Sequence, residues 1–151
     1  MVKRWGISIL VVLIVFTMAG CMNAADKAQA WQESPLFQSN GFSMIGEEGH
    51  IGFLYDDSDV MRFKPDKVQK YMWHLWGNEQ ELDGKFKVIA SPEDGGEPVT
   101  VLAESYLSGP NNGAMRHIPS QMSLPAKGMW KLDAYVGDLL FGTIFVKVHE
   151  S

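Results

Sequence analysis

Three aspartates lie within the short segment Asp56-Asp57-Ser58-Asp59. Carboxylate oxygens are the ligands that Ca²⁺ prefers in proteins, so Asp56, Asp57 and Asp59 form a candidate calcium site. The segment lacks the glycine and the distal glutamate of an EF-hand loop, and solvated carboxylates in a turn are the competing interpretation. Elsewhere the sequence has no His-x-His, His-Glu-x-x-His or cysteine pair, so we expect no other metal site and no cofactor.

Histidines and serines provide the other residue types that could do chemistry. None of the four histidines stands at a recognisable spacing from a serine, and the Gly-x-Ser-x-Gly motif of a nucleophile elbow is absent. We therefore predict no catalytic residue and a protein that is not an enzyme. A Ser/His hydrolase stays an alternative, with a site near His74 or His117, because catalytic triads are assembled in space rather than in sequence.

The segment 70–77, K-Y-M-W-H-L-W-G, is the densest group of aromatic side chains. Successive side chains of a β-strand point to opposite faces, so this segment has two different faces. One face carries Tyr71, Trp73 and Leu75, and we predict that it belongs to the core. The other face carries Met72, His74 and Trp76. This second face is the candidate surface for a ligand or partner, unless the preceding tether or residues 41–50 cover it.

The only cysteine, Cys21, follows a typical export signal. Lys3 and Arg4 precede an apolar run over residues 7–16, which is too short to span a membrane. An unpaired cysteine in an exported protein requires an explanation, because it cannot form an internal disulfide. The cysteine is therefore a candidate site of modification.

Met18-Ala19-Gly20-Cys21 resembles the lipobox of bacterial lipoproteins, with methionine in place of the more common leucine. The resemblance implies that the sulfur of Cys21 receives a diacylglyceryl group and that the chain is cut before this residue. Two acyl chains anchor a protein stably to a membrane. We expect a signal peptide over residues 1–20 and a flexible, lipidated tether over residues 21–40. The alternative is an ordinary signal peptide with an incidental cysteine.

The net charge indicates how the exported domain lies relative to the membrane surface and argues against nucleic-acid binding. The formal net charge is −5, and loss of Lys3 and Arg4 with residues 1–20 leaves 11 basic against 18 acidic residues, a net charge of −7. An acidic chain lacks the electrostatic footprint of a nucleic-acid-binding protein. Anionic lipid headgroups repel it, so we expect the domain to stand off the extracytoplasmic face of the cell membrane on its tether.

Residues 41–151 have the pattern of an all-β domain. Short apolar runs alternate with turn-forming segments, and no long segment has a helical period. The expected strands span residues 51–55, 68–76, 85–90, 99–106, 115–122, 129–136 and 140–148. Gly137-Asp138 predicts a two-residue hairpin turn between the last two strands. About seven strands over this length favour an immunoglobulin-like β-sandwich.

Two longer segments, residues 63–77 and 124–148, together with the lipobox, resemble a family of small Bacillus-type (Firmicute) lipoproteins that is classed as a domain of unknown function. The second segment is also similar to the closing hairpin of many bacterial immunoglobulin-like domains, where a Gly-x-Trp-x-Leu strand leads through a tight turn. The resemblance implies the fold and the location. It carries over no catalytic residue.

The expected function is non-enzymatic binding at the membrane. We predict an interaction module whose partner is a protein or the cell wall. One alternative is a cell-wall or carbohydrate-binding module that stacks sugars on exposed aromatic side chains such as Trp76. Another is a protease-inhibitor-like domain that presents an exposed loop, at residues 91–98 or 108–114.

Overall fold

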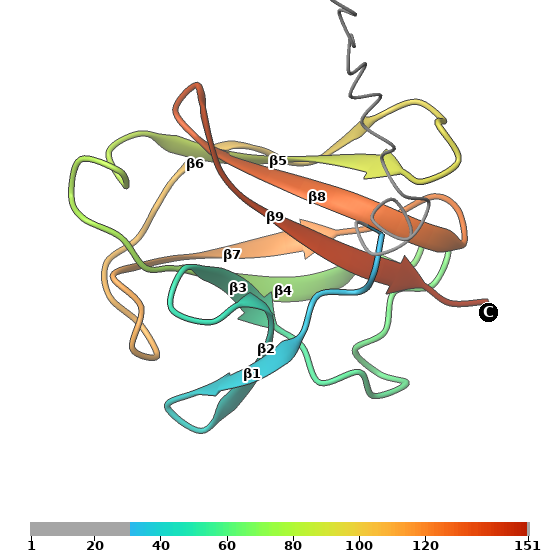
Figure 1. Cartoon of the computed structure of the whole chain (residues 1–151), viewed down its shortest axis with the longest axis horizontal. Coiled ribbons are helices and arrows are strands. Elements are labelled where there is room, and N and C mark those ends of the chain that lie inside the picture. The colour runs from blue at the N-terminus through green and yellow to red at the C-terminus, as the bar shows by residue number, and fades with distance from the viewer. Residues whose placement is uncertain (1–30, 151) are drawn as a thin grey trace, which may run out of the picture.

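The computed structural model describes residues 31–150, which form two β-sheets packed face to face (Figure 1). The five-stranded sheet has the order β1-β2-β3-β4-β7, and its strands are β1 (Leu36–Ser39), β2 (Phe42–Glu47), β3 (Ile51–Leu54), β4 (Gln69–Leu75) and β7 (Arg116–Met122). The four-stranded sheet has the order β6-β5-β8-β9, and its strands are β6 (Val99–Tyr106), β5 (Lys85–Pro92), β8 (Gly128–Val136) and β9 (Leu139–Val148). Neighbouring strands are antiparallel throughout.

The prediction of an all-β sandwich is confirmed. Each of the seven expected strands is present within two residues of its expected ends, as β3 to β9. The two-residue turn is also confirmed, because Val136 pairs with Leu139 across Gly137-Asp138. Among residues 31–150, no helix is long and apolar enough to cross a membrane.

The β1–β2 hairpin was missed, so the sheets contain nine strands instead of seven. β1 falls within the segment that was expected to be a flexible tether, and the sheet therefore begins before residue 41. The turn of this hairpin is Asn40-Gly41, and both residues have positive φ, at 48° and 82°. Asn-Gly is the preferred sequence for such a type I′ turn, so the signal was present in the sequence.

The core lies between the two sheets. Alternating residues of β5, β8 and β9 are buried there, as are Tyr71 and Trp73 of β4. Around Phe53 the aromatic rings of Tyr55, Phe63 and Tyr71 pack with centroids 5.3–6.2 Å apart. Aromatic pairs in this range pack favourably beyond their burial, so this group is a rigid centre of the sandwich.

The segment before β1 packs against the last strand. Ser34 exchanges two hydrogen bonds with Phe145, one through its backbone N–H and one through its hydroxyl oxygen, each 2.9 Å long. The ring of Trp31 lies edge-on to the ring of Phe145, with centroids 5.4 Å apart. The predicted signal peptide (residues 1–20), Cys21 and the first part of the tether lie outside the described residues.

Candidate functional site

A loop partly covers the face that carries Met72, His74 and Trp76, leaving His74 buried and the other two side chains half-buried. The loop between β6 and β7 folds over it and contacts each of the three side chains. Asn111 Nδ2 lies 3.1 Å from Met72 Sδ, Asn112 Nδ2 lies 3.1 Å from His74 Nε2, and Trp76 Nε1 donates to the carbonyl oxygen of Gly113 at 2.8 Å. This face is thus a second, partly packed layer, in which His74 is unavailable to a partner whereas Met72 and Trp76 keep part of their surface exposed.

His74 is fully buried in this layer. Its Nδ1 lies 3.1 Å from the carbonyl oxygen of Met72, and its Nε2 faces the side-chain amide of Asn112. A neutral ring with its proton on Nδ1 donates to the carbonyl and accepts from the amide, so both nitrogens are satisfied. Burial lowers the pKa of His74, and the nearby His117 adds to this effect. His74 therefore packs and orders the loop as a neutral side chain.

The acidic segment after β3 does not converge on one point. Asp56 Oδ1 accepts a hydrogen bond from the backbone N–H of Ser58 at 3.0 Å. Asp57 pairs with Arg62 at 2.9 Å, and Asp59 pairs with Lys64 at 2.9 Å. Each carboxylate thus has its own partner within the loop, and the geometry does not support the three aspartates as joint calcium ligands.

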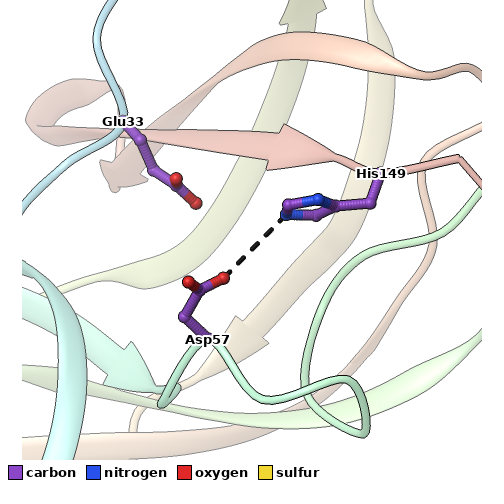
Figure 2. Close-up of side chains that lie close together, drawn as sticks. All are labelled: Glu33, Asp57 and His149. Carbon is purple, nitrogen blue, oxygen red and sulfur yellow. Dashed lines mark ion pairs between the residues drawn. The ribbon is translucent and has the colours of Figure 1, made fainter.

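Asp57 instead belongs to a cluster with Glu33 and His149, drawn in Figure 2. One donor atom from each residue lies within 4.8 Å of the other two, and His149 Nε2 is 3.9 Å from Asp57 Oδ1. Within residues 31–150, this is the one group of three or more acidic, histidine or cysteine side chains that lies close enough to share an ion. Two carboxylates and an imidazole can bind a divalent metal ion.

Three distant parts of the chain bring this cluster together. Glu33 comes from the segment before β1, Asp57 from the loop after β3, and His149 from the residue after β9. The backbone N–H of His149 donates to the carbonyl oxygen of Phe63 at 2.8 Å, which fixes the end of the chain beside the Asp57 loop. Asp57 itself has φ 56°, a left-handed conformation that aspartate tolerates better than most residues.

The electrostatics of the cluster are uneven. Although Glu33 as a residue is exposed, partial burial of its carboxyl group raises its pKa, and the Asp57 carboxylate raises it further. The hydrogen bond from Arg62 instead lowers the pKa of Asp57. Burial raises the pKa of Tyr55, and the carboxylates of Glu33 and Asp57 add to the shift. Asp57 is therefore the more acidic of the two carboxyl groups, since Lys147 and His149 lower the pKa of Glu33 without offsetting burial and the Asp57 carboxylate.

Two buried polar atoms at the cluster have no hydrogen-bond partner among the described residues: the Tyr55 hydroxyl and His149 Nε2. The Asp57 and Glu33 carboxylates lie close enough to the hydroxyl to act on its pKa, but no acceptor meets hydrogen-bond geometry. Buried polar groups in folded proteins are almost always paired, so two such atoms facing the same carboxylates require an explanation.

Sequence reasoning placed Asp57 among its candidates and missed Glu33 and His149. The three positions are separated by 24 and 92 residues, as 57 − 33 and 149 − 57, so no local spacing indicates a shared site. The remaining histidines turn to other partners, since His50 Nε2 lies 2.6 Å from the carbonyl oxygen of Phe141 and His117 Nδ1 lies 2.7 Å from that of Gly109.

A separate, mostly apolar hollow of about 540 Å³ lies beside β4 and β7. Its lining includes Leu54, Met61, Met72, Leu102 and Pro119. Met72 is the one member of the predicted binding face that borders this hollow. The volume lies within the range of pockets that bind small molecules or side chains of a partner.

The sequence matches a family model described as a domain of unknown function, DUF4871, over residues 23–146. The chain belongs to this family. Because the match covers most of the chain, the resemblance to a family of unknown function is confirmed at this level. No curated protein matches the sequence.

The fold is similar to the crystal structure of a candidate lipoprotein from Bacillus anthracis. The TM-score is 0.61 with 22% sequence identity, and the match covers 79% of this chain and 86% of that one. At this identity the likeness shows a shared β-sandwich fold. It assigns no residue of the DUF4871 chain to a function.

Proposed function

We propose that this DUF4871 protein is a lipoprotein held at the extracytoplasmic face of the cell membrane by a diacylglyceryl group on Cys21. The observation that carries the proposal is the lipobox-like Met18-Ala19-Gly20-Cys21 after a charged and apolar leader, in a chain with a single cysteine. A family match to a domain of unknown function and a structural neighbour described as a candidate lipoprotein support it.

A Cys21→Ser variant tests the anchor in cells. Without the thiol, no lipid can be attached, so the variant should either be released from the membrane fraction or remain as the unprocessed precursor. Cell fractionation and mass spectrometry of the N-terminal peptide measure both outcomes. Unchanged processing and unchanged membrane retention would show that the cysteine is incidental.

We further infer that the last seven strands have an immunoglobulin-like connectivity. Named in chain order, strands β3 to β9 become A, B, C, C′, E, F and G. The two sheets then have the orders A-B-E (β3-β4-β7) and C′-C-F-G (β6-β5-β8-β9), as in immunoglobulin-like domains. The β1–β2 hairpin then extends the A-B-E sheet beyond strand A. An arrangement of this kind leaves loops and sheet faces free for binding without a catalytic centre.

The domain acts as a non-enzymatic binding module, and the apolar hollow beside β4 and β7 receives an apolar side chain of an extracytoplasmic protein. The hollow is the observation that supports this role, since central apolar pockets that accept a partner's side chain provide most of the energy of many interfaces. Met72 and Pro119, opposite each other on β4 and β7, line it.

Crosslinking in intact cells, followed by mass spectrometry, tests this role. Pro119 is exposed, so Pro119→Arg places a charge in the hollow without disturbing the core. Thr100→Arg, at an exposed position of β6, is the matched control. We expect a crosslinked partner that Pro119→Arg loses and Thr100→Arg keeps. If all three proteins give the same crosslinked species, the hollow is not the binding surface.

Sugar binding through Trp76 has less support. Its indole N–H is already bonded to Gly113, and its ring packs against Phe37 with centroids 6.0 Å apart. The ring is half-buried, so it offers a sugar less surface than a fully exposed ring would. Of the two loops considered for protease inhibition, residues 93–98 are exposed, whereas residues 111–113 are fixed to β4.

A further inference from the structure

We propose that Glu33, Asp57 and His149, with the hydroxyl oxygen of Tyr55, form a binding site for a divalent transition-metal cation, with Zn²⁺ as the best-fitting ion. The site lies apart from the apolar hollow and does not depend on lipidation. A bound ion would link the segment before β1, which leads from the proposed anchor, to the residue that follows the last strand of the sandwich.

The distances in the cluster suit metal ligands better than they suit hydrogen bonds. His149 Nε2 and Asp57 Oδ1 are 3.9 Å apart, too far for a hydrogen bond, and all three donor atoms lie within 4.8 Å of one another. Ligand atoms that hold one Zn²⁺ at ~2.1 Å with tetrahedral angles are roughly 3.4 Å apart. A small rotation of these side chains would bring them to that separation.

Tyr55 gives independent evidence for a ligand at this point. Its side chain is only 1% exposed, and its hydroxyl has no hydrogen-bond partner among the described residues. Tyr55 directly follows β3 and stands two residues before Asp57, and the carboxylates of Glu33 and Asp57 both raise the pKa of its hydroxyl. The Nε2 atom of His149 is buried and unpartnered at the same place. A bound cation would satisfy both the oxygen and the nitrogen.

The local charge leaves room for a cation. Arg62 bonds to both oxygens of Asp57, at 2.9 and 3.3 Å, but a carboxylate has about four lone-pair sites and can accept a further ligand. Lys147 lies near Glu33, but burial and the Asp57 carboxylate outweigh it, and the pKa of Glu33 is raised.

The kinds of ligand select the metal class. Ca²⁺ takes six to eight oxygen ligands and Mg²⁺ requires octahedral oxygen, whereas Zn²⁺ binds imidazole and carboxylate readily in a four-coordinate site. One imidazole nitrogen and two carboxylates, with one phenol oxygen, match the four-coordinate case. Mn²⁺ prefers oxygen ligands and should bind more weakly than Zn²⁺ by the usual order of affinities.

Calorimetric titration of the full-length protein in detergent with ZnCl₂, after treatment with a chelator, tests the proposal. We expect saturable binding of one ion per chain and a higher melting temperature with Zn²⁺ than with the chelator. Glu33→Gln and His149→Gln should each weaken binding by more than roughly tenfold, since each removes a ligand. Glu97→Gln makes the same charge change at an exposed loop position and should bind as the wild type does.

The Glu33→Gln variant keeps the test informative because it should fold well. Glu33 is an exposed residue and glutamine has nearly the same shape, so in the presence of chelator this variant should melt close to the wild-type temperature. It should nevertheless lose the increase caused by Zn²⁺. The proposal is overturned if the wild type shows no saturable binding, or if both variants bind Zn²⁺ as tightly as the wild type. Tighter binding of Ca²⁺ than of Zn²⁺ would overturn the assigned metal class.

Discussion

At the scale of single residues, His74 shows how a histidine that looks functional can serve packing. It is fully buried, and both its ring nitrogens face hydrogen-bond partners when the ring is neutral. The alternation of residues 70–77 predicts that Tyr71 and Trp73 are core, and this is confirmed. What the sequence could not show is the partial cover over the opposite face, because it comes from a loop 37 to 39 residues away.

The lowered pKa of His74 makes the stability of the protein depend on pH. The unfolded chain binds a proton at His74 near pH 6.5, whereas the folded chain resists this. The unfolded state thus binds more protons below that pH, and the free energy of unfolding should fall as the pH drops through about 6.5. The contribution is fully present above this pH. Urea unfolding at several pH values measures it.

A His74→Gln variant isolates this effect, because glutamine can accept from Asn112 but does not titrate. The decrease in stability between pH 7 and 5 should be smaller in this variant than in the wild type. His117→Gln is the matched control, since it replaces a histidine that is only half-buried. Equal slopes for wild type and His74→Gln would mean that His74 is not the group that titrates.

At the same scale, the Glu33, Asp57 and His149 cluster could not have been found from the sequence. Asp57 was noticed because two other aspartates stand near it, yet those two turn to Ser58 and Lys64. Its actual neighbours come from the two ends of the domain. The spacing of residues in the sequence can reveal a site whose residues lie in one segment. This site instead forms only when the whole sandwich folds and brings three distant segments together.

At the scale of elements, the β1–β2 hairpin is the part of the sheet that apolar periodicity does not predict. Its strands are four and six residues long, and the first is mostly exposed, so periodicity carries little information there. The turn sequence Asn40-Gly41 carries the stronger signal. By contrast, the β8–β9 hairpin was predicted correctly because both long strands alternate buried and less buried side chains and the turn is short.

Gly41→Ala should destabilise the protein by about 1 kcal/mol, because Gly41 has φ 82° and an alanine strains this left-handed conformation. A Cβ at Gly41 would meet nothing within 4 Å, so the cost is purely one of the backbone. Urea unfolding measures the change.

Gly109→Ala is the control for this prediction. A Cβ there also meets nothing within 4 Å, and this glycine does not have a left-handed φ. Its free energy of unfolding should stay within about 0.5 kcal/mol of the wild type or rise slightly. If both variants lose the same stability, the turn conformation does not explain the effect.

At the scale of the whole molecule, the sequence predicts the layers better than it predicts their assembly. Apolar alternation places seven strands, but it does not say which strands share a sheet. The chain changes sheet between β4 and β5, between β6 and β7, and between β7 and β8. These crossings bury Trp73 against Phe86 of the opposite sheet, with ring centroids 5.3 Å apart. Only the assembled sandwich brings Glu33 and His149 together at the Asp57 loop.

The segment before β1 is therefore part of the folded domain as well as a link toward Cys21, the proposed lipid site. Ser34 exchanges two hydrogen bonds with Phe145 of β9, the ring of Trp31 packs on Phe145, and the Pro35 carbonyl accepts from the N–H of Gly46 at 3.1 Å. A chain that starts at Leu36 should be less stable than one that starts at Trp31 by roughly 2–3 kcal/mol, since each of the three hydrogen bonds contributes about 1 kcal/mol.

Urea unfolding in the presence of a chelator measures this difference without any contribution from a metal ion. Ser34→Ala in the longer chain removes only the acceptor for the Phe145 N–H and should cost about 1 kcal/mol, a fraction of the loss on truncation. If the two chain lengths unfold at the same urea concentration, the contacts of residues 31–35 do not stabilise the sandwich. With the contacts intact, the segment that leads from the proposed lipid site at Cys21 is linked to β9 as well as to β1.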